Sequence, residues 1–460
     1  MIAMHLDEVA AAMGATSSAA PGNPLVTGVS IDSRTVQPGE LFFAVRGDRF
    51  DGHDYLDQAA SAGAVACVVS RRETNAPIPC LGVADTVAAL GRFAAYHRTR
   101  IPATVIAVTG SNGKTTTKRM IDHVLGQRLR GRAAPKSFNN NLGVPLTLLS
   151  ADRDDQYLVV EIGSNAPGEV GALAAVASPQ IGVVTSVGFA HLEGLGGVAG
   201  VVREKLSLLL YVDPAGLGVV NVDRPEVRAL LRYPTRPELV TFGVSDAADL
   251  CITEARGGLD GLQFRINGDA QRSLAVCGTH NALNATAAFA VARRMGLDDD
   301  DIAAGLASFQ PADMRLNVMR LGQVTVINDC YNANPSSMAA AIDVLTAAPA
   351  GRRVLALGDM LELGAETRQW HERIGRQAGE AGVDLLLAVG PHASVVITGA
   401  RQAGPDIQTL VYDDAEQAGA AVGDWARPGD VVLVKGSRAM AMERVVEALR
   451  QYTLADAPAA

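Results

Sequence analysis

A glycine-rich segment with a lysine and a run of hydroxyl residues is the first feature of this sequence that could do chemistry. The segment reads VIAVTGSNGKTTTKRM and begins at Val105. Gly110 and Gly113 let the backbone bend so that successive amides face a phosphate, and Lys114 adds a mobile ammonium. Thr115 follows as a magnesium ligand. Because an apolar run precedes the loop and a helical pattern follows it, we predict a nucleotide site rather than a glycine turn ahead of a surface helix.

The loop is shorter than the common G-x-x-x-x-G-K-S/T form, which would have a glycine at Val108. The residues expected to contact the nucleotide are Gly110, Ser111, Asn112, Gly113, Lys114, Thr115 and Thr116.

Acidic and histidine side chains follow two further apolar runs. Glu161 ends the run in YLVVEIGSN, and His191 and Glu193 follow VVTSVG. The carboxyl ends of parallel strands meet at one edge of a sheet, beside the ligand. One such residue alone is more often structural, but two at adjacent strand ends beside a phosphate loop favour magnesium coordination.

These side chains need a mostly parallel sheet to bring them together. From residue 103 to 313, apolar runs rich in Val and Ile alternate with helical segments, as in TVIAVTG, YLVVEIG, IGVVTSVG and GLGVVNVD. This alternation predicts a sheet that is buried on both faces. Turn signals at Asp260-Gly261 and Asn267-Gly268 predict antiparallel hairpins added to that sheet.

Two smaller blocks flank this central one. The first mixes short strand-like runs such as LFFAVRG with Ala-rich helical stretches, up to a boundary at Pro102. In the last block the β-α-β rhythm returns, in QVTVIND, RRVLALGD and DVVLVKGSR, which predicts a Rossmann-like domain. The predicted fold is α/β in three domains: a small α/β domain (1–102), a central domain with the phosphate-binding loop (103–313) and a Rossmann-like domain (314–460).

Length and charge limit the function further. A chain of 460 residues suggests about three domains. The 49 acidic and 40 basic residues give a net charge of −9, which argues against binding nucleic acid or anionic membrane through general electrostatics. Asp7 and Glu8 stand where an export signal would be positive, and no stretch reaches the ~20 apolar residues of a membrane span. We expect a cytoplasmic protein without membrane insertion.

Several motifs together resemble the Mur ligases, the ATP-dependent amide-forming enzymes of bacterial cell-wall precursor synthesis. Those found across the family are TGSNGKTTT, SFNNNLGVPLTLL and GTHNALNATAA. Four others resemble the branch that joins D-alanyl-D-alanine to UDP-N-acetylmuramoyl-tripeptide: IDSRTVQPGELFFAVRGDRFDGHDY, DCYNANP, LGDMLELG and VLVKGSRAMAME. The resemblance implies a monomer that uses ATP and Mg²⁺, phosphorylates the tripeptide carboxylate and transfers the acyl group to the dipeptide amine.

The resemblance also implies roles for residues at matching motif positions. Asn281 and Asn284 would read adenine, and Asp329 and Asn334 would hold ribose or the domain junction. The implied catalytic residues are Lys114, His191 and Lys205; the implied metal ligands are Thr115, Glu161, His191 and Lys205. The implied substrate contacts are Ser33 and Arg34 for the UDP-sugar, Asn140 and Asn141 for the muramoyl portion, Asn334, and Lys435, Ser437 and Arg438 for the dipeptide carboxylate. DCYNANP could equally be a turn whose Asn and Pro only shape the backbone.

Lys205, in VVREKLSLL, aligns with a lysine that these ligases use in carbamylated form. Taken alone, it would be a solvated helix lysine. An ammonium ~6 Å from a metal would repel it by about 3 kcal/mol per unit charge at an effective dielectric of ~20, whereas a carbamate is an anionic ligand. The family often has K-G-E, but here Leu206 and Ser207 follow, so a supporting carboxylate is missing from its expected place.

Two other functions fit part of the pattern. One is a different ligase of the same fold, which adds one amino acid to a muramoyl peptide or glutamate to folate; DCYNANP favours the dipeptide-adding branch instead. The other is a regulatory protein that uses the loop as a nucleotide switch. Such a protein would not need Glu161, His191 and Lys205 together.

Overall fold

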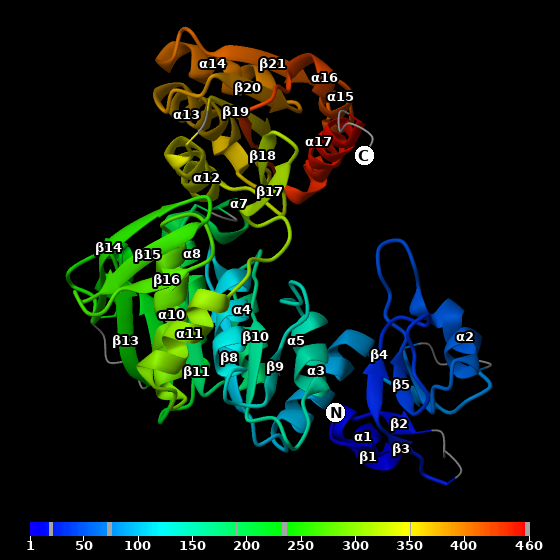
Figure 1. Cartoon of the computed structure of the whole chain (residues 1–460). Coiled ribbons are helices and arrows are strands. Elements are labelled where there is room, and N and C mark those ends of the chain that lie inside the picture. The colour runs from blue at the N-terminus through cyan, green and yellow to red at the C-terminus, as the bar shows by residue number, and fades with distance from the viewer. Residues whose placement is uncertain (18–21, 71–75, 190–191, 232–236, 350, 456–460) are drawn as a thin grey trace.

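The structure is a computed structural model that describes residues 1–17, 22–70, 76–189, 192–231, 237–349 and 351–455. It is an α/β protein whose chain passes through an N-terminal, a central and a C-terminal part (Figure 1). Among the described residues, no helix has both the length and the apolar character needed to cross a bilayer.

The central part is built on a nine-stranded sheet in the order β16-β15-β14-β13-β12-β11-β8-β10-β9. Pairing is parallel from β9 to β14, and β14-β15-β16 are antiparallel, which confirms the predicted hairpins. The strands are β8 (Thr104–Thr109), β9 (Gly131–Ala133), β10 (Tyr157–Glu161), β11 (Ile181–Val184), β12 (Leu217–Asn221), β13 (Glu238–Gly243), β14 (Leu250–Gly258), β15 (Gly261–Ile266) and β16 (Arg272–Leu274).

Helices cover both faces of this sheet because its strands are apolar on both sides. In β8, Val105 and Ala107 enter one hydrophobic core, whereas Ile106 and Val108 enter the other. The first core includes α5 (Gly143–Ser150), α6 (Glu169–Ala177), α8 (Val198–Leu206) and α9 (Pro225–Leu230); the second includes α4 (Lys114–Leu125), α10 (Asn281–Arg294) and α11 (Asp299–Ser308).

The C-terminal part has a six-stranded sheet in the order β17-β18-β22-β19-β20-β21, parallel except for the β17-β18 hairpin. Its strands are β17 (Asn317–Leu321), β18 (Val324–Asp329), β19 (Arg352–Gly358), β20 (Leu385–Val389), β21 (Gln408–Tyr412) and β22 (Asp430–Lys435). One core contains α12 (Pro335–Ala347), α13 (Thr367–Glu380) and α14 (Ala393–Ala403), and the other contains α15 (Ala415–Ala420), α16 (Val422–Trp425) and α17 (Glu443–Ala455).

The N-terminal part has a five-stranded sheet in the order β2-β7-β6-β5-β4 and a separate β1-β3 pair. Its elements are β1 (Met4–His5), α1 (Leu6–Met13), β2 (Thr16–Ser17), β3 (Leu25–Val26), β4 (Gly28–Ser30), β5 (Glu40–Phe43), α2 (Leu56–Ser61), β6 (Ala66–Val69), β7 (Cys80–Gly82) and α3 (Thr86–Arg98).

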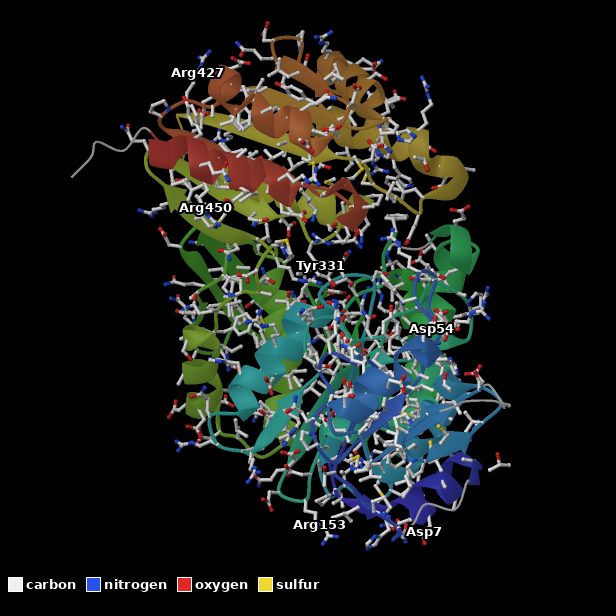
Figure 2. All side chains as sticks on the ribbon, turned by 90° about the vertical axis from the view of Figure 1, so that its right-hand side faces the viewer. Asp7, Asp54, Arg153, Tyr331, Arg427 and Arg450 are labelled. Atoms are coloured by element: carbon white, nitrogen blue, oxygen red, sulfur yellow. The ribbon has the colours of Figure 1, made fainter. Side chains whose placement is uncertain are left out.

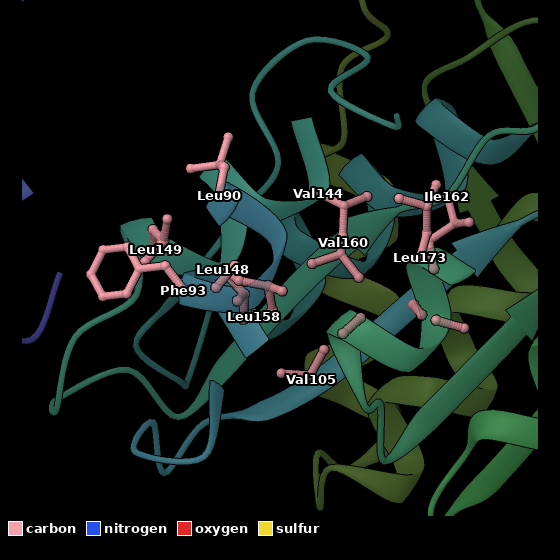
Figure 3. Close-up of a cluster of buried hydrophobic side chains, with 14 of the residues drawn as sticks. Leu90, Phe93, Val105, Val144, Leu148, Leu149, Leu158, Val160, Ile162 and Leu173 are labelled. Carbon is pink, nitrogen blue, oxygen red and sulfur yellow. The ribbon is translucent and has the colours of Figure 1, made fainter. Parts of the chain in front are cut away.

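Helix α3 joins the N-terminal and central parts. Its side chains Leu90 and Phe93 belong to the same buried cluster as Leu148 of α5 and Leu173 of α6 (Figure 3). The first hydrophobic core therefore continues across residues 102 and 103, where the sequence predicts a domain boundary.

Candidate active site

The phosphate-binding loop lies between β8 and α4. At Gly113 the backbone has φ +80°, and a Cβ there would lie 2.3 Å from Oδ1 of Asn284. Only glycine tolerates both conditions, so the loop can approach α10 this closely. The Nζ atom of Lys114 donates to the carbonyl of Gly110, 2.7 Å away, and closes the loop on itself.

This loop opens into a cavity of about 810 Å³ between the central and C-terminal parts. Tyr331, which lines it, lies between those two parts in Figure 2. The wall combines the loop, the segment 139–141, the end of β10 and the start of α12. The volume is within the range of small-molecule and nucleotide sites.

Glu161, at the end of β10, is only 1% exposed and lies in this wall. It accepts hydrogen bonds from Thr115 Oγ1 at 2.9 Å and Asn139 Nδ2 at 3.0 Å, and Lys118 Nζ is 3.1 Å away. Burial raises the pKa of this carboxyl, but the charges of Lys118 and Lys114 outweigh burial, so the pKa is lowered. An ionised carboxylate beside a threonine hydroxyl offers the oxygen ligands that Mg²⁺ prefers.

His191 lies outside the described residues. Glu193, two positions on, is exposed in the short helix α7 (Leu192–Leu195). A Cβ added at Gly364, in the C-terminal part, would lie 3.2 Å from the Cβ of Glu193, so the segment after β11 packs against that part.

Lys205 is buried in α8 with 1% exposure, unlike a solvated helix lysine. Its Nζ donates to Ser164 Oγ at 2.6 Å, and Ser164 lines the cavity. Burial and the nearby Lys114 lower the pKa of Lys205 to about 7, although Glu204 and Glu169 oppose the shift. A large share of this amine is therefore neutral near pH 7.

Ser207, which replaces the expected glutamate, is turned away from Lys205. Its Oγ donates to the carbonyl of Glu204 at 2.6 Å. The Glu204 carboxylate in turn accepts from the backbone N–H groups of Gly168 at 2.7 Å and Val170 at 2.8 Å. Glu204 thus satisfies free donors at the start of α6 and fixes α8 against it.

Four residues of the site were missed by the sequence analysis: Lys118, Asn139, Ser164 and Arg315. Arg315 donates to Thr115 Oγ1 at 3.0 Å, and its guanidinium lies 4.0 Å from the centre of the Tyr331 ring. Burial lowers the pKa of Lys118, which also donates to the carbonyl of Lys136. Helical spacing in KTTTKRM could have placed Lys118 one turn after Lys114, but nothing in ADMRLNV marks Arg315.

The two asparagines predicted near adenine line the cavity through a buried network. Asn284 accepts from Thr117 Oγ1 at 3.1 Å and donates to Asn281 Oδ1 at 2.8 Å. Asn281 donates to the carbonyl of Cys277 at 2.8 Å. The network therefore connects α10 to Thr117 in the first turn of α4, directly after the phosphate-binding loop.

Asp329 and Lys435 face each other across β18 and β22. Lys435 Nζ lies 2.5 Å from Asp329 Oδ2 and donates to the carbonyl of Asn332 at 2.9 Å. Asn140, Asn141 and Asn334 also line the cavity. Asn140 Oδ1 accepts from the N–H of Gly143 at 2.9 Å, at the start of α5.

Ser33, Arg34, Ser437 and Arg438 are absent from the described cavity wall. Ser33 Oγ donates to Gln58 at 2.9 Å, and Arg34 is bonded to Asp32, whose pKa it lowers to about 2. Ser437 Oγ accepts from the N–H of Leu361 at 2.9 Å, and Arg438 lies 2.9 Å from Glu443. These four residues were predicted to contact the UDP-sugar and the dipeptide carboxylate rather than the nucleotide, and those roles stay predictions.

Asp359 of the LGDMLELG segment forms a cluster with His371 of α13 and with His392, the residue before α14. Asp359 and His371 are buried, and His392 is half-buried. His392 Nδ1 is 2.8 Å from Asp359 Oδ2. His371 Nε2 accepts from the N–H of Met360 at 3.1 Å, so its lone pair is already used. The cluster fastens the loop after β19 to α13 and α14 and leaves no free imidazole nitrogen on His371 for a metal.

Comparison with known proteins agrees with this architecture. Three family models match in chain order: "Mur ligase family, catalytic domain" (25–98), "Mur ligase middle domain" (108–292) and "Mur ligase, glutamate ligase domain" (314–438). The UDP-N-acetylmuramoyl-tripeptide--D-alanyl-D-alanine ligase of Escherichia coli K12 is 36% identical over 434 residues, which are 92% of this chain and 93% of that protein. The ligase of the same name from Mycobacterium tuberculosis H37Rv is 37% identical over 473 aligned positions, with 92% of each chain covered.

Solved structures agree as well. A MurF from Acinetobacter baumannii superposes with a TM-score of 0.88 at 31% identity and covers 98% of this chain and 99% of its own. MurF from Thermotoga maritima, solved in complex with ADP, has a TM-score of 0.83 at 27% identity and covers 94% and 99%. The family models match in chain order, the relatives align over more than nine-tenths of the chain, and the solved structures share its fold. This chain therefore belongs to the Mur ligase family.

Proposed function

We propose that this protein joins D-alanyl-D-alanine to UDP-N-acetylmuramoyl-tripeptide, with ATP cleaved to ADP and phosphate, and so makes the pentapeptide precursor of peptidoglycan. Relatives over more than nine-tenths of the chain bear the name of this reaction. The observation that carries the proposal is one cavity in which the phosphate loop, Thr115 and Glu161 face a wall from the C-terminal part.

The first step brings the tripeptide carboxylate to the γ-phosphate of ATP. An anion must approach a polyanion, so the site has to offset the repulsion. Beside the phosphate loop, the positive charges of Lys118, Lys114 and Arg315 all act on the carboxylate of Glu161. This part of the cavity is therefore the one suited to the phosphate charge. The carboxylate oxygen bonds to phosphorus, ADP leaves, and an acyl phosphate forms.

The residues present fit a magnesium site. Thr115 Oγ1 and Glu161 Oε2 lie 2.9 Å apart beside the phosphate loop, and we propose them as ligands with His191 and with Lys205 as a carbamate. When bound, Mg²⁺ would neutralise phosphate charge.

Lys205 suits carbamylation for a physical reason. Only a neutral amine reacts with CO₂, and burial lowers the pKa of this amine to about 7. The amine nitrogen bonds to the carbon of CO₂ and releases a proton, so the neutral amine becomes an anionic carbamate within the field of Lys114. Ser164, 2.6 Å away, would then donate to a carbamate oxygen.

In the second step the neutral amine of D-alanyl-D-alanine attacks the acyl carbon, phosphate leaves, and an amide remains. Water would hydrolyse the acyl phosphate, so the C-terminal part has to cover the site. The other substrate roles stay predictions: the UDP-sugar at Ser33 and Arg34, the muramoyl portion at Asn140 and Asn141, adenine at Asn281 and Asn284, ribose or the domain junction at Asp329 and Asn334, and the dipeptide carboxylate at Lys435, Ser437 and Arg438. Because Lys435 is paired with Asp329, the dipeptide carboxylate would have to share the Lys435 ammonium with Asp329.

We propose a monomer that works in the cytoplasm.

The test is to incubate the protein with ATP, Mg²⁺, UDP-N-acetylmuramoyl-tripeptide and D-alanyl-D-alanine and to look for the pentapeptide by mass spectrometry. Single amino acids and glutamate with folate serve as competing acceptors. We expect an adduct with the dipeptide only. Folded protein that forms no adduct, or that consumes ATP equally without both peptides, would overturn the proposal.

A further inference from the structure

The side-chain amide of Asn112 connects the phosphate loop to the C-terminal part. Asn334 Nδ2 donates to Asn112 Oδ1 at 2.7 Å, and Asn112 Nδ2 donates to Ser336 Oγ at 3.0 Å. The partners are more than 200 positions away in the chain, at the start of α12, which lies on the side of the C-terminal part that faces the central part (Figure 1). The amide therefore joins the central and C-terminal parts directly, at the wall of the cavity.

On the side of α12, the contact is rigid. Ser336 Oγ donates to Asn334 Oδ1 at 3.1 Å, which closes a ring of three side chains. Asn334 Oδ1 also accepts from the N–H of Ser337 at 2.9 Å, in a capping box that begins α12. Because the cap fixes Asn334 to the helix, the position of Asn112 is tied to the whole helix.

On the side of the loop, the contact is rigid as well. The carbonyl of Asn112 accepts from Thr185 Oγ1 at 2.5 Å and from Ser186 Oγ at 3.1 Å, and its N–H donates to Ser186 Oγ at 2.9 Å. A Cβ added at Gly188 would lie 3.1 Å from Ser336 Oγ, so α12 sits directly on this segment. If the C-terminal part moved away, the amide bonds would break or the loop would deform.

We propose that Asn112 is a positioning residue that couples nucleotide affinity to the placement of the C-terminal part, through the Asn112–Asn334–Ser336 contact. The contact forms only when α12 lies on the loop, so it shifts the population toward the arrangement with a complete nucleotide cavity. By linkage, nucleotide binding then favours the same arrangement. This inference rests on the proposed function only in assuming that the cavity takes a nucleotide.

The test is a double-mutant cycle on the dissociation constant of Mg²⁺-ADP, measured by isothermal titration calorimetry in wild type, Ser336→Ala, Asn112→Ala and the double variant. Ser336→Ala removes one hydroxyl of the ring. We expect it to weaken ADP binding by about three- to tenfold in the wild-type background, as the loss of one or two hydrogen bonds would, and by less than about twofold when Asn112 is already alanine.

Thr346→Ala is the matched control, because Thr346 is exposed on the same helix, and its hydroxyl donates to the carbonyl of Ile342 at 2.8 Å, away from the ring. We expect ADP affinity to change by less than about twofold. Thermal melting verifies that each variant is folded; if Asn112→Ala is not, Asn112→Ser, which is too short to bridge to α12, replaces it.

An equal effect of Ser336→Ala in both backgrounds would mean that Ser336 touches the nucleotide directly, and would overturn the proposal. An equal loss in Thr346→Ala would overturn it too. ADP binding requires no peptide substrate, so the two proposals can fail separately. If the cycle shows the expected coupling but no pentapeptide forms, only the proposed function is contradicted. If the cycle is additive and the pentapeptide does form, only this coupling is contradicted.

Discussion

At the scale of single residues, the charged side chains of the site are buried, and their protonation depends on whether an opposite charge lies close by. Glu161 remains ionised because Lys118 and Lys114 offset the cost of burying it. Lys205 lacks such a close carboxylate, because Glu204 is used by the start of α6. A buried charge without a partner is costly, and a lowered pKa is how a lysine avoids it. Burial lowers the pKa of Lys118 as well, but Glu161, 3.1 Å away, opposes that shift, whereas Lys205 Nζ is bonded to the neutral hydroxyl of Ser164. Lys205 is therefore better suited to modification than Lys118.

The replacement Lys205→Ala should lower kcat/KM by at least about a hundredfold, because the site would lose a predicted metal ligand. Short carboxylates such as acetate should restore part of the activity, and the mass of the intact wild-type protein under added bicarbonate should show the carbamate. Lys205→Met fills the same space without the amine and is the control for packing. Full activity of Lys205→Ala without any added carboxylate would contradict the carbamate assignment.

His97 should make stability depend on pH. It is fully buried in α3, accepts from the N–H of Ile2 at 3.1 Å, and burial lowers its pKa from 6.5 to about 4. Between these values the unfolded chain binds more protons than the folded one, so the free energy of unfolding should fall as the pH falls from 6.5 to about 4. The slope from this residue is at most about 1.4 kcal/mol per pH unit.

Urea unfolding across that pH range measures the slope. His97→Gln keeps an acceptor for the N–H of Ile2 but does not titrate, so its stability should change less steeply with pH. An identical pH profile in wild type and His97→Gln would refute this role of His97.

The site could be predicted from the sequence only in part. The loop glycines and Lys114 stand in a fixed local spacing, and Glu161 ends an obvious strand, so one segment identifies each of them. Arg315 and Ser164 act through distant partners, and no local spacing records such contacts. The sequence analysis expected a missing carboxylate beside Lys205 because Ser207 stands where the family often has glutamate. In the structure, the partner of Lys205 is Ser164, which is 41 residues away in the chain.

At the scale of elements, the apolar runs predicted the strands well because their physics is local. Runs such as TVIAVTG and DLLLAVG are buried on both faces and form β8 and β20. The hairpins at Asp260-Gly261 and Asn267-Gly268 were predicted for the same reason. The close packing of α3 on α5 and α6 was not, because an amphipathic pattern indicates which face is buried but not what covers it.

An aromatic contact joins α13 to the segment after β11. The rings of Phe189 and Trp370 lie 4.7 Å apart between centres, with Arg224 over Phe189 at 4.6 Å, and Trp370 Nε1 donates to Glu366 at 2.9 Å. Trp370 is 9% exposed, so most of its ring is removed from water by this packing.

We expect Trp370→Ala to lower the free energy of unfolding by about 3 kcal/mol, because it removes a large buried ring. Trp370→Phe retains the aromatic contact and loses only the hydrogen bond to Glu366, so its effect should be about 1 kcal/mol. Chemical denaturation of the three proteins provides the comparison. Equal stabilities of wild type and Trp370→Ala would show that this contact does not hold the two parts together.

At the scale of the whole molecule, the N-terminal part is bound to the central part through one continuous core. Leu90 and Phe93 of α3 pack with Leu148 of α5, so the boundary at residue 102 divides the sequence but not the core (Figure 3). The C-terminal part, in contrast, has two cores largely of its own.

Two fragments should therefore behave differently. A fragment of residues 1–313 keeps the shared core and should be soluble, with a cooperative thermal transition in circular dichroism, but should bind ADP weakly because its cavity lacks one wall. A fragment of residues 103–460 exposes the faces of α5 and α6 that α3 covers, and should aggregate or melt well below the full chain. Equal stability of the 103–460 fragment and the full chain would contradict the shared core.

The sheet order of the central part has a further consequence for how the protein avoids self-association. Its two edge strands, β9 and β16, are only three residues long, and each bears an arginine, Arg132 and Arg272. Arg132 is 2.8 Å from Asp155, and Arg272 lies over the ring of Phe289. Short, charged edges offer few free backbone groups to a second chain, so a wide and very apolar sheet ends on both sides in borders that resist the growth of aggregates.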